Sequence, residues 1–137
     1  PGADPDFISK VQSRKVCLEN CIVSDQEMLI SGSIRVANIS YHKQVIVRYS
    51  LNNWITHDDI CASYVANSND GPTDRFSFTL PVPHYFGIGS KMEFALMYTT
   101  GGHIHWDNND GQNYVIECYN KAMSDADASD QSWMHFL

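Results

Sequence analysis

The chain has 137 residues, which is enough for one domain with its own hydrophobic core and too few for two domains of ordinary size. Its formal charge of −7 and its nine scattered basic residues argue against a nucleic-acid partner, because binding a phosphate backbone needs clustered Lys and Arg. No apolar run of about 18 residues occurs, so the sequence predicts no membrane span.

Short segments with alternating apolar and polar residues follow one another along the chain, while helical periodicity is weak. In residues 74–81, for example, Phe76 and Phe78 are expected to face a core and the residues between them to face solvent. Gly101-Gly102 is a strong signal for a hairpin turn. The expected strands are residues 16–23, 29–38, 44–51, 59–66, 74–81, 92–100, 103–107 and 113–118.

Regularly spaced short strands with polar turns between them predict an all-β fold, namely an eight-stranded antiparallel immunoglobulin-like β-sandwich. We expect this sandwich to occupy residues 16–118. Residues 1–15 are expected to be a flexible, loosely ordered N-terminal flank. The tail 119–137 is expected to be a linker or a short acidic helix, whose last residues either dock on the domain or stay free.

The cysteines Cys17, Cys21, Cys61 and Cys118 leave three interpretations open. Their even number permits two disulfides, but the expected core is large enough to be stable without them. Only Cys17 and Cys21 are close in sequence, whereas a zinc site needs two close pairs. We therefore expect free, mostly buried thiols, and neither a metal nor a cofactor.

The segment WDNNDGQNY, from Trp106 to Tyr114, is unusually rich in amides and carboxylates. It does not fit a calcium-binding EF-hand loop, because counting from Asp107 places Cys118 where the twelfth-position glutamate belongs. It does not fit a phosphate loop either, because Gly111 leads into an expected strand and the loop is acidic.

An enzymatic interpretation has some candidate residues. Asp107 and Asp110 resemble a carboxylate pair, and His103 or His105 is available as a base. However, the sequence contains no nucleophile elbow and no cofactor fingerprint. We therefore expect a noncatalytic protein.

A sugar-binding interpretation fits this composition best. Amides donate and accept hydrogen bonds, which suits neighbouring sugar hydroxyls, and aromatic rings offer flat apolar platforms to a pyranose. Trp54 lies in a second amide-rich segment, LNNWITHDD, so Trp54 and Trp106 are candidate platforms. A buried core position is the alternative for each tryptophan.

Three separated motifs resemble family 21 carbohydrate-binding modules: VANISYHKQVIVRYSLNNW (36–54), DRFSFTLP (74–81) and EFALMY with WDNNDGQNY (93–114). The resemblance is narrower for the modules of glycogen-targeting regulatory subunits of protein phosphatase 1. It implies a β-sandwich that binds glycogen or a related α-1,4-glucan. It also implies a protein that anchors the phosphatase near its substrates.

The resemblance also implies two sugar surfaces. The first would use Trp54 and Trp106 as platforms, Asn108 and Asn113 as hydrogen-bonding amides, and Lys43 nearby. The second would use the rings of Tyr41 and Tyr64. A further platform aromatic of amylolytic modules falls near Ala95 here, so one stacking contact is expected to be missing.

The same resemblance links WDNNDGQNY to recruitment of glycogen synthase, for which Asp107, Asp110 and Tyr114 are the candidates. The segment Arg14-Lys15-Val16-Cys17-Leu18 imitates the docking motif for the phosphatase catalytic subunit but ends in leucine. We interpret it as strand and expect docking outside this chain.

Two alternatives stay open: a protein-interaction domain with little sugar binding, and a starch-binding module of an amylolytic enzyme. Free cysteines and the lack of a signal segment favour a cytoplasmic location on glycogen particles.

Overall fold

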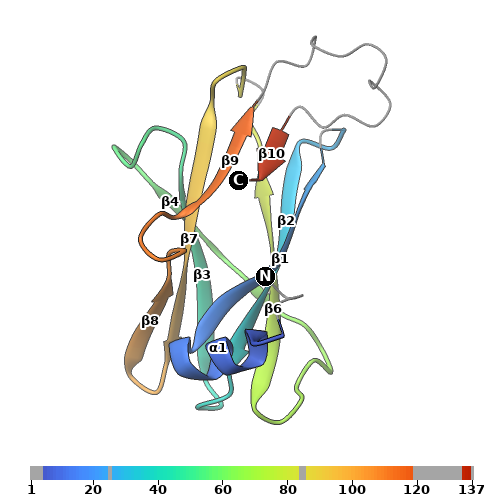
Figure 1. Cartoon of the computed structure of the whole chain (residues 1–137), viewed down its shortest axis with the longest axis vertical. Coiled ribbons are helices and arrows are strands. Elements are labelled where there is room, and N and C mark those ends of the chain that lie inside the picture. Colours follow the sequence, from blue (N-terminus) through green and yellow to red (C-terminus); the bar gives the residue numbers. More distant parts are fainter. Residues whose placement is uncertain (1–4, 25, 84–85, 119–133, 137) are drawn as a thin grey trace.

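The strands found here follow the expected order along the chain, with a helix before the first of them (Figure 1). The computed structural model describes residues 5–24, 26–83, 86–118 and 134–136. Its elements are α1 (Phe7–Arg14), β1 (Val16–Ser24), β2 (Leu29–Ala37), β3 (Lys43–Ser50), β4 (Asp58–Cys61), β5 (Ser63–Tyr64), β6 (Thr73–Pro81), β7 (Lys91–Thr100), β8 (His103–Asp107), β9 (Tyr114–Cys118) and β10 (Met134–Phe136).

These strands form two antiparallel sheets, which confirms the predicted sandwich (Figure 1). The four-stranded sheet has the order β1-β2-β6-β5, and the six-stranded sheet has the order β10-β9-β7-β3-β4, with β8 also paired to β7. Among the described residues the strands number ten rather than eight. One extra strand arises because the expected segment 59–66 divides at Ala62, where the chain passes from the six-stranded sheet (β4) to the four-stranded sheet (β5). The other is β10.

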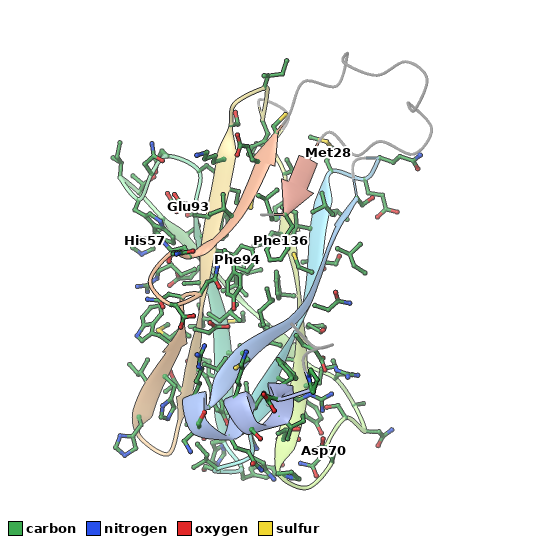
Figure 2. All side chains as sticks on the ribbon, viewed as in Figure 1. Met28, His57, Asp70, Glu93, Phe94 and Phe136 are labelled. Atoms are coloured by element: carbon green, nitrogen blue, oxygen red, sulfur yellow. The ribbon has the colours of Figure 1, made fainter. Side chains whose placement is uncertain are left out.

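The core lies between the sheets and is built by the predicted alternation. Phe76 and Phe78 of β6 are buried, and Ser77 between them is exposed. Figure 2 shows Phe94 of β7 and Phe136 of β10 in this interior, where their rings stack with centroids 6.4 Å apart. Apolar side chains buried on both inner faces supply the main stabilisation of the fold.

The N-terminal flank contains a helix, which corrects the prediction of a loosely ordered segment. Phe7 and Val11 are one helical turn apart in α1, and both are buried in a small cluster with Cys17 of β1. The helix ends where Lys15 adopts a left-handed conformation, with φ of 78°. Two apolar residues in an otherwise polar segment give a weak helical signal, and the packing against β1 stabilises the helix. No helix in the described part of the chain is long and apolar enough to cross a bilayer.

The described part of the C-terminal tail, β10, packs against the domain. β10 extends the six-stranded sheet by pairing with β9, and Phe136 lies opposite Ile116. The Phe136 ring also stacks on Tyr114, with centroids 6.0 Å apart. The expected linker or acidic helix falls in residues 119–133, which lie outside the described residues.

All four cysteines are free thiols. Cys17 and Cys118 are buried, Cys21 is half-buried and Cys61 is exposed. Burial, followed by the nearby charge of Asp107, raises the pKa of Cys17 to about 11. Burial also raises the pKa of Cys21 to about 12. These two thiols therefore stay protonated and unreactive at neutral pH.

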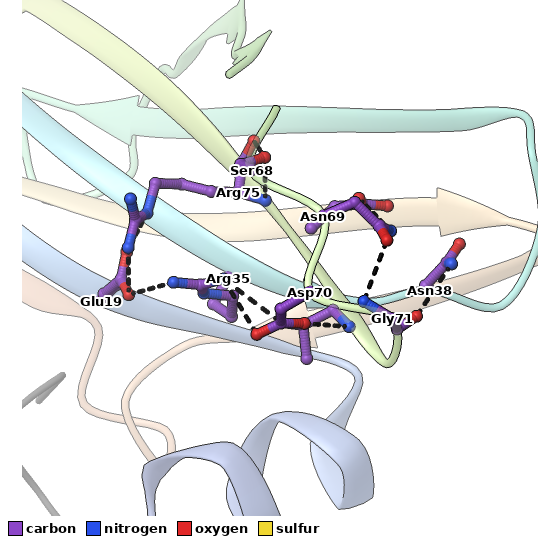
Figure 3. Close-up of polar contacts among 10 residues, drawn as sticks. Glu19, Arg35, Asn38, Ser68, Asn69, Asp70, Gly71 and Arg75 are labelled. Atoms are coloured by element: carbon purple, nitrogen blue, oxygen red, sulfur yellow. Dashed lines mark hydrogen bonds and ion pairs between the residues drawn. The ribbon is translucent and has the colours of Figure 1, made fainter. Parts of the chain in front are cut away.

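An ion-pair network covers the outer face of the four-stranded sheet (Figure 3). Arg35 and Arg75 lie directly opposite each other on β2 and β6, which would bring two like charges together. A β-bulge between Leu18 and Asn20 places Glu19 between them. The Glu19 carboxylate accepts hydrogen bonds of 2.9 Å from Arg35 Nη2 and 2.7 Å from Arg75 Nε. One bulged residue thus pairs with both arginines, and Asp70 pairs with Arg35 as well, at 3.5 Å.

This network makes stability depend on pH. Burial alone would raise the pKa of Glu19, but the hydrogen bonds and charges of Arg75 and Arg35 together hold it below its usual range. A depressed pKa means that the stabilisation is present above the unfolded-state pKa and is lost as the pH falls through the folded-state pKa. The relevant window is therefore acidic.

We expect Glu19→Gln to lower the free energy of unfolding by about 1–3 kcal/mol at neutral pH, because two guanidinium groups lose their carboxylate. The difference from the unchanged chain should shrink as the pH falls through the lowered pKa of Glu19 in the folded chain, where Glu19 itself becomes protonated. Urea unfolding at a series of pH values measures this. Glu27→Gln, at an exposed position, is the control, and a pH-independent difference for Glu19→Gln would contradict the prediction.

Candidate functional site

Four of the five residues predicted for the first sugar surface line one cavity. This cavity has a volume of about 210 Å³ and is lined by Arg48, Trp54, Ala95, Trp106, Asn108 and Asn113. Hereafter we call it the tryptophan cavity. β3, β7 and β8 supply Arg48, Ala95 and Trp106, and two loops supply the rest. The fifth predicted residue, Lys43, lies elsewhere.

The loop of residues 108–113 lies between two strands, β8 and β9, that pair one after the other with β7. β8 pairs with β7 as far as Asp107 opposite Leu96, and β9 resumes with Tyr114 opposite Phe94. The six loop residues therefore leave the sheet opposite a single residue of β7, Ala95. The outward excursion places the loop amides beside Trp106 at the cavity.

The amide-rich composition of this loop has a local structural cause as well. Asn109, Asp110 and Asn113 have positive φ of 54°, 58° and 59°, and Gly111 has φ of 89°. Asn, Asp and Gly are the residues that tolerate this backbone region best. The loop closes where the Asn113 N–H donates to the Asn108 carbonyl at 2.7 Å. Composition alone could not separate this turn chemistry from ligand binding.

Asp107 fixes the base of the loop. Its Oδ2 accepts hydrogen bonds from the Leu18 N–H at 2.8 Å and from the Tyr114 hydroxyl at 2.6 Å, and its Oδ1 accepts from the Asn109 N–H at 3.2 Å. Burial, followed by the charge of Asp107, raises the pKa of Tyr114, so the hydroxyl keeps the proton that it donates. The carboxylate joins β1, β9 and the loop in one buried contact.

This burial corrects part of the predicted partner surface. Asp107 is 7% exposed and Tyr114 is 8% exposed, so neither side chain is available for a direct contact with a partner protein. Asp110 differs, because its side chain is 75% exposed, and within the described part of the chain its ion-pair partner is Arg14, at 3.4 Å. Of the three predicted partner residues, Asp110 alone fits the role.

Trp54 is held in a strained loop after β3. Its φ is 67°, which is uncommon for a bulky residue; this conformation costs free energy and persists because the surrounding contacts impose it. The buried Ser50 hydroxyl accepts a 2.9 Å hydrogen bond from the Trp54 N–H and donates to the Thr56 carbonyl at 2.7 Å. The Trp54 ring is half-buried, and its buried indole N–H has no partner among the described residues. Trp106 is 45% exposed, so both rings lie at the surface rather than in the core.

The sequence did not single out Arg48 or Asp59. Arg48 Nε and Nη2 donate to the two carboxylate oxygens of Asp59 at 2.8 and 3.0 Å. The guanidinium carbon lies 5.5 Å from the centre of the Trp106 ring. The hydrogen bond from Arg48, the largest favourable effect, holds the pKa of Asp59 below its usual range. Only the register of β4, β3, β7 and β8 reveals that these residues meet.

The second predicted surface forms a separate and larger cavity, of about 690 Å³. Tyr41 and Tyr64 both line it, as predicted, and their side chains are 91% and 50% exposed. Lys43 lines this cavity and not the first, which corrects its assignment. It begins β3 at the opposite end from Trp54, and its ammonium pairs with the buried Asp74 carboxylate at 3.1 Å.

The buried role of Asp107 can be tested against its exposed neighbour. We expect Asp107→Asn to lower the free energy of unfolding by about 1–3 kcal/mol, because an amide has one acceptor oxygen and cannot accept from Leu18 and Tyr114 on one side and from Asn109 on the other. The matched change Asp110→Asn should alter it by less than about 0.5 kcal/mol. Urea unfolding followed by tryptophan fluorescence gives both values. Equal effects of the two changes would contradict a supporting role for Asp107.

Comparison with known proteins gives a consistent result. The model of the carbohydrate/starch-binding module (family 21) matches residues 10–117. Glycogen-binding subunit 76A of Drosophila melanogaster is 43% identical over 86% of this chain, which covers 17% of that protein. Protein phosphatase 1 regulatory subunit 3A of Oryctolagus cuniculus is 44% identical over 88% of this chain, which covers 11% of that protein. The chain therefore spans less than a fifth of the length of these two relatives.

Two solved structures share the fold. The carbohydrate-binding module of the muscle glycogen-targeting subunit of protein phosphatase 1 superimposes with a TM-score of 0.75 at 43% identity, covering 87% of this chain and 86% of that one. The starch-binding domain of Rhizopus oryzae glucoamylase, solved with β-cyclodextrin and maltoheptaose, gives a TM-score of 0.57 at 31% identity. It covers 73% of this chain and 90% of that one.

Proposed function

Because the chain belongs to family 21 of the carbohydrate/starch-binding modules, we propose that it is a noncatalytic module that binds glycogen or a related α-1,4-glucan. The observation that carries this proposal is the tryptophan cavity, where Trp54, Trp106, Asn108 and Asn113 meet at the surface. Two rings with amides beside them suit a ligand that alternates C–H faces with hydroxyl groups.

The second cavity supports a second sugar contact. Tyr41 presents an almost fully exposed ring, and Tyr64 is steadied by an edge-to-face contact with Phe76 at 5.7 Å. Both cavities are open and of modest size, so each buries little of a flexible glucan and binds it weakly. The ligand is neutral, and binding should therefore depend little on salt.

For the parent protein we propose a targeting role. Its relatives are named as a glycogen-binding subunit and as regulatory subunits of protein phosphatase 1. A module that holds the phosphatase catalytic subunit on glycogen, in the cytoplasm, raises its effective concentration toward substrates bound to the same particle, such as glycogen synthase. Docking of the catalytic subunit is assigned to a segment outside this chain.

An alternative is a protein-interaction domain that recruits glycogen synthase with weak or no sugar binding. The exposed loop residue Asp110 favours a protein contact at this loop, next to Trp106. The two functions differ in what the tryptophans do. Sugar binding at the tryptophan cavity requires Trp54, whereas capture of glycogen synthase through the loop does not.

We expect the unchanged chain to co-sediment with glycogen and a much smaller fraction of Trp54→Ala and Trp106→Ala to pellet, because each change removes one aromatic face from the tryptophan cavity. Circular dichroism first establishes that the variants are folded. Ile22→Ala, which removes an exposed apolar side chain from β1 on the other sheet, is the control and should pellet normally. Failure of the unchanged chain to pellet would overturn the sugar proposal and make glycogen synthase the ligand to test.

We expect Tyr41→Ala and Tyr64→Ala to weaken glycogen binding without abolishing it, because the tryptophan cavity stays intact. The double variant should still bind glycogen through the tryptophan cavity, because the two changes together remove only the second sugar contact. Binding isotherms at low and at high salt should nearly coincide for all variants. A steep loss of binding with salt would contradict a neutral ligand.

A further inference from the structure

Arg48 belongs to β3, next to the edge strand β4, and faces the outside of the six-stranded sheet. In the strand register it is opposite Asp59 of β4 on one side and opposite Ala95 of β7 on the other. Both Asp59 oxygens accept hydrogen bonds from its guanidinium, which leaves the planar group little freedom to rotate. The side chain is 31% exposed and lines the tryptophan cavity.

The small side chain of Ala95 lets Arg48 meet Trp106 across β7. Trp106 pairs with Met97, two residues along β7 from Ala95, so Trp106 and Ala95 are diagonal neighbours on the same face, and Arg48 lies directly opposite Ala95 from the other side. A larger residue at position 95 would stand between Arg48 and Trp106. The observed distance of 5.5 Å from guanidinium carbon to ring centre is that of a cation–π contact.

The pairing with Asp59 does not use all of the hydrogen-bonding capacity of Arg48. A guanidinium has five N–H donors, and Asp59 takes one from Nε and one from Nη2. The remaining donors belong to a flat cation at the wall of a cavity that already offers rings and amides. Sugar hydroxyl oxygens are acceptors, and a charged donor forms a stronger hydrogen bond with them than an amide does.

We propose that Arg48 contacts the bound glucan directly and that Asp59 is its positioning residue. This inference rests on the proposed function of the tryptophan cavity. It adds a charged donor and a third flat surface to the two tryptophans. It also makes the Trp106 platform dependent on β3 and β4, because the guanidinium supports the indole from that side.

The same chain supplies a matched comparison. Arg75 of β6 is paired to Glu19 by two hydrogen bonds of 2.7 and 3.1 Å and is 40% exposed, much as Arg48 is paired to Asp59. Arg75 lies on the other sheet and lines neither of the two cavities. A change in affinity that Arg48→Met and Arg75→Met share comes from the loss of an ion pair. A change in affinity found in Arg48→Met alone comes from the position of Arg48 at the tryptophan cavity.

The first experiment measures the affinity of maltoheptaose by titration calorimetry for the unchanged chain, Arg48→Met, Arg48→Lys and Arg75→Met. We expect Arg48→Met to bind at least about tenfold more weakly, because it loses one or two hydrogen bonds from a charged donor. Arg48→Lys should recover only part of this, because an ammonium lacks the planar fork. Arg75→Met should bind as the unchanged chain does.

The second experiment tests for contact itself. Phenylglyoxal, which modifies arginine side chains, is applied with and without saturating maltoheptaose, and mass spectrometry reports modification at Arg14, Arg48 and Arg75. We expect the sugar to protect Arg48 alone. In Asp59→Asn, Arg48 should be modified faster without sugar, because its guanidinium is no longer held, and binding should weaken less than in Arg48→Met.

The outcomes separate the two proposals. Absence of binding by the unchanged chain would overturn both of them. Normal binding by Arg48→Met, or no protection of Arg48 despite binding by the unchanged chain, would overturn only the direct contact of Arg48 with sugar. Protection of Arg48 together with weaker binding by Arg48→Met, and normal binding by Arg75→Met, would support it.

Discussion

The candidate site depends on one buried carboxylate. Asp107 stands where strand pairing along β7 breaks off, and it accepts hydrogen bonds from β1, from β9 and from the loop that leaves the sheet. The ring of Tyr114, its partner, stacks on Phe94 in the core. The loop amides and Trp106 therefore rest on the packed interior of the sandwich rather than on a free surface turn. Groups that are already ordered before binding lose little conformational entropy when the ligand binds, so this support of the loop strengthens an otherwise weak affinity.

The fold could be predicted from the sequence because each strand carries its own signal. Alternation in a segment such as 74–81 reports directly which side chains face the core. Helix α1 carries too little signal of this kind, since only Phe7 and Val11 mark it and the contact with β1 stabilises it. The alternating pattern does not change where the chain passes from one sheet to the other at Ala62, so the sequence predicted residues 59–66 as a single strand.

The candidate site was less predictable, because side-chain positions depend on register. The family resemblance brought together Trp54, Trp106 and the two amides correctly, but it placed Lys43 in the wrong cavity. The asparagines and aspartates of the loop were candidates for ligands and partners, whereas several are there because the backbone has positive φ. Arg48 and Asp59, eleven residues apart, gave no signal at all, since only their pairing across two strands makes them neighbours.

The short strand β10 also helps to protect this sandwich from edge-to-edge association with other molecules. The outermost strand of any sheet presents unpaired N–H and C=O groups to a stray strand from another molecule. Here β10, β4 and β5 end their sheets with only three, four and two residues. β8, which pairs with β7 alone among the described strands, is also short, at five residues. The long edge strand β1 carries the bulge at Glu19 and is contacted by α1. A fragment ending at Cys118 would expose the edge of β9 and lose the Phe136 ring from the interior. We expect such a fragment to self-associate through β9 under conditions in which it is still folded.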